Sequence, residues 1–164
     1  MATRGEFKVA ITKEDLVFAA AHFITFAGHR CETLHGHNYR AGVVVEGGLE
    51  KDTWFVLDFA AVKKLMRRLT DELDHRVLLP RDNPKLTISE ENGSLRVAFD
   101  GQPRYVFPTR DCVILPIPNT TVEMLSQYLA GRVRAELGAL HLKAIEVEVE
   151  ENFGQSASYR ETLD

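Results

Sequence analysis

The sequence contains little cysteine and no long apolar run, and these two shortages exclude several classes of protein. Among its 164 residues there are two cysteines, Cys31 and Cys112, which lie far apart and are expected to remain thiols in a reducing cytosol. No apolar stretch approaches the ~20 residues that span a bilayer. The first residues also lack the apolar core of a secretory signal. We therefore expect a cytoplasmic protein with no disulfide framework and no membrane partner.

An excess of positive charge is also absent. The net charge is -4 and the pI is about 5.9, which disfavours a general nucleic-acid binder. A local basic pocket for an anionic substrate stays compatible with this balance. The chain has no internal repeat and no low-complexity stretch, and its hydrophobic content of 45% is ordinary for a globular protein. We expect one domain over residues 1–164.

Apolar alternation predicts strands at both ends of the chain. Residues 35–46 and 144–150 alternate well between apolar and polar side chains. Two shorter apolar runs, 7–11 and 16–21, flank a polar turn and indicate one interrupted strand. A last short strand is expected around Ser158 and Tyr159. Local turns between these strands favour antiparallel pairing.

Two helices are predicted between the strands. Asp58 is a candidate N-cap for a helix that ends near Leu73. Thr120 and Glu123 resemble a capping box for a second helix, which Gly138 ends. Between the helices, residues 85–99 with Asn92-Gly93 near their middle read as a β-hairpin. The fold class is therefore α+β, with a four-stranded antiparallel sheet packed by two helices and an insertion at about 81–112.

His35-Gly36-His37 is the first motif that carries chemistry. Residues two apart on a strand point to one face, so one metal ion can receive both imidazoles. His22 ends an apolar run and is the third candidate ligand, whereas its rival His29 lies in an expected loop. Three imidazoles leave one position of a tetrahedral zinc ion open, as in catalytic sites. The alternative is a half-buried, hydrogen-bonded pair without metal.

Two further groups suit proton transfer. Cys31 lies four residues before His35, and a thiol near a divalent cation has a lowered pKa and acts as a base or nucleophile. A fourth zinc ligand and an inert small hydrophobe are alternatives that spacing leaves open. Asp74-His75 follows the first helix, where the carboxylate can hold the imidazole tautomer. Its alternative is a histidine that meets the helix dipole.

Glu151 is the third candidate for chemistry. It shares the face of Val147 and Val149, whereas Glu148 and Glu150 point the other way. A carboxylate on an apolar face needs a partner, and a ligand with adjacent N–H donors provides one. The alternative is that the strand ends at Glu150.

In combination, these motifs resemble the 6-pyruvoyl-tetrahydropterin synthase / 6-carboxy-tetrahydropterin synthase family. The resemblance covers most of the chain and rests on segments in the family's order: Phe18–His22, Cys31–Tyr39, Val56–Phe59, Leu73–His75, Asn119–Glu123, Val149–Glu151 and Tyr159.

This resemblance implies a tunnelling fold assembled as a homo-hexamer, a dimer of trimers, with active sites between subunits. It implies Zn²⁺ held by His22, His35 and His37. Cys31 matches the catalytic thiol, and Asp74 with His75 matches a proton relay contributed by a neighbouring subunit. The implied substrate-binding residues are Glu151, which anchors the pterin ring, and Thr120, Thr121 and Glu123.

The implied substrate is 7,8-dihydroneopterin triphosphate. Three residues between Cys31 and His35 resemble the bacterial branch, which makes 6-carboxy-5,6,7,8-tetrahydropterin for the queuosine pathway and releases triphosphate and acetaldehyde. The pyruvoyl branch, which only eliminates triphosphate, is the alternative. Glu32, directly after Cys31, is a possible second catalytic residue and suggests dual activity that also gives 6-hydroxymethyl-dihydropterin for folate synthesis.

Two competing functions rank below this one. A pterin- or purine-binding structural module of the same fold has no need of Cys31 or of Asp74-His75. A zinc hydrolase is disfavoured because the sequence lacks a base at the spacing of H-E-x-x-H. The insertion has three compatible roles: it covers the site, extends a subunit contact, or does nothing catalytic.

Overall fold

The longest strand, β3 (His35–Gly47), organises the main sheet of the computed structural model, which describes residues 6–12, 14, 16–138 and 141–163. Two short strands, β1 (Phe7–Ile11) and β2 (Val17–His22), pair antiparallel with successive parts of β3. The interrupted strand that the sequence predicts is thus confirmed. Lys13 and Asp15, inside its polar turn, lie outside the described residues.

The C-terminal strands complete the antiparallel part of the sheet. β9 (Leu142–Asn152) pairs with β3, and β10 (Gln155–Thr162) pairs with β9. The period-two alternation places Val43 and Val45 of β3 beside Val147 of β9 on one buried face. The sequence therefore predicts these four strands correctly, although β9 begins earlier and ends later than its apolar run.

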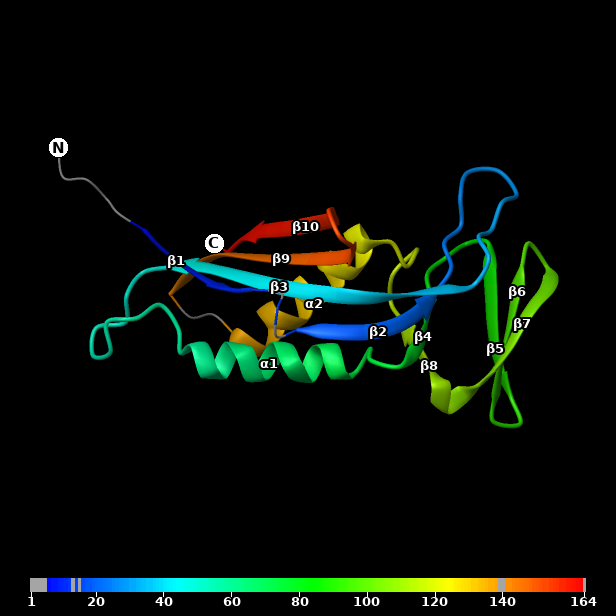
Figure 1. Cartoon of the computed structure of the whole chain (residues 1–164), viewed down its shortest axis with the longest axis horizontal. Coiled ribbons are helices and arrows are strands. Elements are labelled where there is room, and N and C mark those ends of the chain that lie inside the picture. Colours follow the sequence, from blue (N-terminus) through cyan, green and yellow to red (C-terminus); the bar gives the residue numbers. More distant parts are fainter. Residues whose placement is uncertain (1–5, 13, 15, 139–140, 164) are drawn as a thin grey trace.

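Two helices cover that buried face, as Figure 1 shows. α1 (Phe59–Asp71) begins at the predicted N-cap, because the Asp58 side chain accepts a hydrogen bond from the backbone N–H of Ala60. α2 (Val122–Leu137) ends at Gly138, which takes a positive φ of 68°. Among the described residues, no helix is long and apolar enough to cross a membrane.

The predicted capping box is wrong. The N-cap of α2 is Thr121, and its side chain makes no capping hydrogen bond. The Thr120 hydroxyl instead donates to the backbone carbonyl of Phe23, 2.9 Å away. Glu123 lies one position earlier in the helix than a capping box requires.

The sheet is larger than the sequence predicts. β4 (Arg76–Pro80) pairs parallel with β2, and β8 (Cys112–Leu115) pairs parallel with β4, giving the order β10-β9-β3-β2-β4-β8. Both strands are short, and neither alternates between apolar and polar residues, so no local pattern predicted them. A short 3₁₀ turn, η2 (Thr109–Asp111), leads into β8.

The inserted segment forms a three-stranded sheet of its own. The predicted hairpin is confirmed as β5 (Leu86–Glu91) and β6 (Ser94–Phe99), joined by Asn92 and Gly93, which both have positive φ. A third strand, β7 (Gln102–Pro108), follows a second turn of the same kind at Asp100-Gly101. This small sheet stands at one end of the molecule, beside the loop between β2 and β3 (Figure 1).

A second hydrophobic cluster fastens the small sheet to the main one. Leu95 and Val97 of β6 pack with Phe23, which follows β2, and with Leu79 of β4. All four side chains are at most 2% exposed. The inserted sheet is therefore packed against the loop that precedes the histidine pair.

Gly36 lies where β2 and β3 approach closely. A Cβ atom on Gly36 would sit 3.2 Å from the carbonyl oxygen of Ala20, so Gly36→Ala forces the two strands apart. We expect it to lower the free energy of unfolding by about 1–3 kcal/mol, the usual cost of overpacking. Urea denaturation measures the change. Gly48→Ala is the matched control, because its Cβ would meet nothing within 4 Å; equal losses in both variants would contradict the close approach.

Candidate metal centre and its surroundings

Three histidines meet at the end of the β2–β3 pair. His22, the last residue of β2, lies directly opposite His35, and His37 follows two residues later on the same face of β3. Their ring centroids are 4.7 to 5.3 Å apart. One nitrogen of each ring lies within 4.8 Å of the others, close enough for one metal ion to hold all three.

Backbone carbonyls orient two of these rings. His22 Nδ1 donates to the Thr120 carbonyl at 2.8 Å, and His35 Nδ1 donates to the Thr33 carbonyl at 2.9 Å. Each bond fixes the tautomer whose Nε2 is free to bind a metal. The structure thus provides the outer hydrogen bonds that metal-binding histidines usually have.

Two ring nitrogens in this group are buried and lack a hydrogen-bond partner. They are Nε2 of His22 and Nε2 of His37. Burial also lowers the pKa of His22 to about 4, so its imidazole is neutral, as a metal ligand must be. Buried orphan nitrogens need an explanation, and a zinc ion bound by three imidazoles gives one. The residues present therefore fit zinc with one open position.

His29 does not compete for this position. It is exposed, and its Nδ1 lies 2.8 Å from a carboxylate oxygen of Asp100 in the turn between β6 and β7. This placement leaves His22, which lies opposite His35, as the third histidine of the group.

Two carboxylates flank the histidines. Strand β9 continues to Asn152, so Glu151 keeps the face that its parity predicts, and its Oε2 lies 3.9 Å from His37 Nε2. Glu32 lies on the other side, with Oε2 3.8 Å from His35 Nδ1 and within hydrogen-bonding distance of the Ile24 N–H. A groove beside His37 runs along Glu151 to Phe153.

Cys31 directly precedes Glu32 in the chain, but its side chain has different neighbours. Its side chain joins the second hydrophobic cluster, and its thiol donates to the Glu32 carbonyl at 3.6 Å. Burial raises the pKa of Cys31, although the nearby Arg104 partly offsets this. Burial likewise raises the pKa of Cys112 to about 11. In the isolated chain, Cys31 is a thiol and not a thiolate at neutral pH.

Asp74 and His75 form a pair directly after α1. His75 Nδ1 lies 2.8 Å from Asp74, whose other oxygen accepts a hydrogen bond from the Ala19 N–H. Burial opposes ionisation of Asp74, but these bonds hold its pKa below the ordinary value. The His75 ring is largely exposed, beside a groove that Gly36 and Asn38 also line. His37 also lines this groove, but among the described residues no hydrogen bond or ion pair joins Asp74 or His75 to the three histidines.

The residues at the start of α2 have different surroundings. Thr120 is fully buried, and its backbone carbonyl accepts the hydrogen bond from His22 Nδ1. Thr121 is half-buried and Glu123 is exposed.

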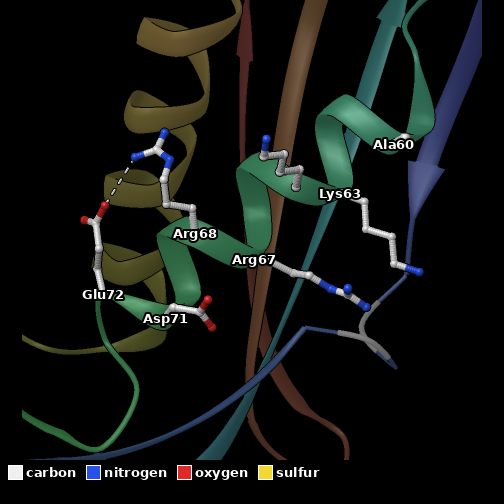
Figure 2. Close-up of a pocket in the computed structure, with 7 residues that line it drawn as sticks. Ala60, Lys63, Arg67, Arg68, Asp71 and Glu72 are labelled. Atoms are coloured by element: carbon white, nitrogen blue, oxygen red, sulfur yellow. Dashed lines mark hydrogen bonds and ion pairs between the residues drawn. The ribbon is translucent and has the colours of Figure 1, made fainter.

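A further surface pocket lies away from the histidines, along the outer side of α1. Figure 2 shows its lysine and arginine side chains extended over the helix, with Arg68 paired to Glu72. Charged side chains on a solvent-exposed helix face line this pocket, and none of them has a buried polar atom without a hydrogen-bond partner.

The sequence matches the family model described as 6-pyruvoyl tetrahydropterin synthase over residues 10–162. The chain belongs to this family. It is 35% identical over 152 residues to a Methanocaldococcus jannaschii protein provisionally named 6-carboxy-5,6,7,8-tetrahydropterin synthase, with 91% of this chain and 92% of that protein covered. A shorter match, 43% over 68 residues, is to the dihydroneopterin monophosphate aldolase of Pyrococcus furiosus, and it covers 41% of this chain and 56% of the aldolase.

Solved structures confirm the tunnelling fold. The 6-pyruvoyltetrahydropterin synthase of Plasmodium vivax superposes with a TM-score of 0.90 at 30% identity, covering 98% of this chain and all of that one. The same enzyme has been solved with a catalytic glutamate replaced by alanine, and it superposes with a TM-score of 0.89. The family match and these structures confirm the predicted resemblance.

Tyr39 is a site residue that the sequence argument did not select. Its ring packs 5.5 Å from His37 and 5.8 Å from His22, and its buried hydroxyl has no hydrogen-bond partner. Burial and then the charges of Glu151 and Glu32 raise its pKa, so it stays a neutral donor. The sequence signal that could have identified Tyr39 is its spacing, because it lies two residues after His37 and so on the same face of β3.

The geometry predicts which histidines bind metal. We expect His22→Ala, His35→Ala and His37→Ala to lose zinc, with affinity falling by more than the ~10–100-fold that loss of an outer-shell partner costs. His29→Ala is the matched control and should keep about one zinc per chain. Elemental analysis after dialysis against a weak chelator measures this. Zinc retained in all three variants would place the metal elsewhere.

Proposed function

We propose that the protein is a zinc-dependent 6-carboxy-tetrahydropterin synthase of the cytoplasm. It converts 7,8-dihydroneopterin triphosphate and water to 6-carboxy-5,6,7,8-tetrahydropterin, triphosphate and acetaldehyde, a reaction of the queuosine pathway. The observation that carries the proposal is the open three-histidine group with Glu151 3.9 Å from His37. The 6-carboxy-tetrahydropterin synthase name of the Methanocaldococcus relative supports this choice of product.

The positions of Glu151 and the histidines suit two ends of one substrate. The Glu151 carboxylate accepts N–H bonds from the pterin ring, which is flat and rich in donors. The ring then directs its hydroxylated side chain toward His22, His35 and His37. A zinc ion bound there supplies positive charge that lowers the pKa of those hydroxyls.

Proton transfers fall to the remaining polar groups. Asp74 fixes the tautomer of His75 by accepting from Nδ1, which leaves Nε2 to exchange a proton with substrate. Because no hydrogen bond or ion pair among the described residues joins this pair to the histidines of its own chain, we propose that it serves the site of a neighbouring subunit in a hexamer. Cys31 is the second proton carrier, and it needs a turn of its side chain toward the histidines.

Glu32 favours a second product. Its carboxylate already faces His35, whereas the Cys31 thiol packs into the apolar cluster. A base there can take the proton from the second side-chain hydroxyl; the bond between the first two side-chain carbons breaks, and its electron pair moves into the pterin ring. Reprotonation gives 6-hydroxymethyl-dihydropterin and a phosphorylated glycolaldehyde. The catalytic glutamate of the Plasmodium vivax enzyme supports this role.

A product assay separates the two reactions. We expect zinc-loaded protein with dihydroneopterin triphosphate to give 6-carboxy-tetrahydropterin and acetaldehyde, and Cys31→Ala to abolish both. Glu32→Gln should remove any hydroxymethyl product and leave the carboxylated one. Mass spectrometry identifies the pterins, and Cys112→Ala is the matched control. A pyruvoyl product from the wild type would contradict the first choice, and no hydroxymethyl product from any form would exclude dual activity.

Glu151→Gln tests the pterin anchor. The variant keeps the shape of the side chain but loses a charge-assisted acceptor, so we expect KM to rise about 10–100-fold. The zinc content should not change, because Glu151 is not among the three grouped ligands. Steady-state kinetics with dihydroneopterin triphosphate measures the effect. An unchanged KM would show that the ring binds elsewhere.

A further inference from the structure

The loop of residues 23–34, which joins β2 to the histidine pair, is held mainly by the inserted region. Lys85 donates to the carbonyls of Phe26 and Gly28. At the other end of the loop, the Leu34 N–H donates to the Tyr105 hydroxyl at 3.1 Å. Figure 1 shows this loop beside the small sheet. The loop therefore takes its shape from β5–β7 and their flanks.

Arg104 of β7 contacts the part of this loop that carries Cys31 and Glu32. Its Nη2 donates to the carbonyl of Glu32 at 3.0 Å and to that of Cys31 at 3.4 Å. One guanidinium nitrogen thus engages two consecutive carbonyls, and the guanidinium lies 5.3 Å from the ring of Tyr105. Charge-assisted bonds of this kind are stronger than neutral ones.

Glu32 lies between these two carbonyls and Cys31 directly precedes the first, so holding both carbonyls restricts the backbone from which both side chains extend. In this backbone arrangement the Glu32 carboxylate lies 3.8 Å from His35, and the Cys31 thiol packs against the cluster of Phe23, Leu95 and Val97. A change in the backbone dihedral angles of Cys31 and Glu32 would redirect both side chains. That change breaks the bonds to Arg104.

We propose that Arg104 is a positioning residue that keeps Glu32, and not Cys31, turned toward the three histidines. The inserted sheet thereby sets the ratio of the products that depend on these two side chains. This proposal rests on the proposed function only for the identity of the products. The orientation of the thiol can be measured without substrate.

Cobalt reports that orientation directly. Co²⁺ in the histidine group gives visible ligand-field bands, and a thiolate that joins it adds a charge-transfer band in the near ultraviolet. We expect wild-type protein with Co²⁺ to show the first and lack the second. Arg104→Ala should gain the charge-transfer band, and Cys31→Ala in the same variant should remove it.

Arg96→Ala is the matched control. Arg96 lies on β6 of the same small sheet, pairs with Glu91 at 2.7 Å and, within the described part of the chain, makes no hydrogen bond or ion pair to residues 23–34. It should leave the cobalt spectrum unchanged. Should Arg104→Ala fail to fold, Tyr105→Phe removes one hydroxyl from the same anchorage and should give a weaker band of the same kind.

Product ratios provide the second measurement. We expect Arg104→Ala to raise the ratio of carboxylated to hydroxymethylated pterin about tenfold, the change that losing a charge-assisted bond typically makes. A raised KM with an unchanged ratio and no thiolate band would overturn the proposal and assign Arg104 to phosphate binding. A thiolate band in the wild type would overturn it as well.

The two proposals fail in different ways. A thiolate band that responds to Arg104→Ala, without pterin turnover in any form, would refute the proposed function and support the positioning role. No cobalt spectrum in any form would refute the metal centre and the positioning role together.

Discussion

The hydrogen bond from His22 Nδ1 to the Thr120 carbonyl is the contact on which the site depends. It connects the end of β2 to the residue before the N-cap of α2, 98 positions later in the chain. The Thr120 hydroxyl bonds to Phe23 in turn, and Asn119 bonds to Thr25 on both sides of its amide. These bonds fix the imidazole in the tautomer that presents Nε2, and they explain why the Thr120 side chain is buried and bonded to Phe23 instead of capping α2.

The rest of the site also depends on contacts between distant segments, because its functional side chains come from several parts of the fold. β3 supplies His35 and His37, β9 supplies Glu151, and the inserted sheet holds the loop with Cys31 and Glu32. The main sheet fixes the histidines rigidly, whereas Cys31 and Glu32 depend on the contacts of a loop. A change in the insertion can therefore alter the chemistry without disturbing the metal.

Sequence patterns predicted the parts of the fold that follow a local rule. The alternation of apolar and polar residues predicted β3 and the face of β9 on which Glu151 lies, and the N-cap Asp58 predicted the start of α1. The parallel strands β4 and β8 were missed, because neither alternates between apolar and polar residues and their parallel pairing leaves no turn signal nearby. The capping box failed for a related reason: Thr120 has a partner far away in the chain. The orientation of Cys31 likewise depends on Arg104, 73 residues away.

X-ray absorption at the zinc edge of the purified protein tests the central claim most directly. Three imidazole ligands with an open position predict a shell of nitrogen and oxygen neighbours at about 2.0–2.1 Å, with a water as the fourth neighbour that substrate replaces. Sulfur at about 2.3 Å would mean that Cys31 closes the site. That result would contradict the account, because it leaves no position on the metal for the pterin side chain.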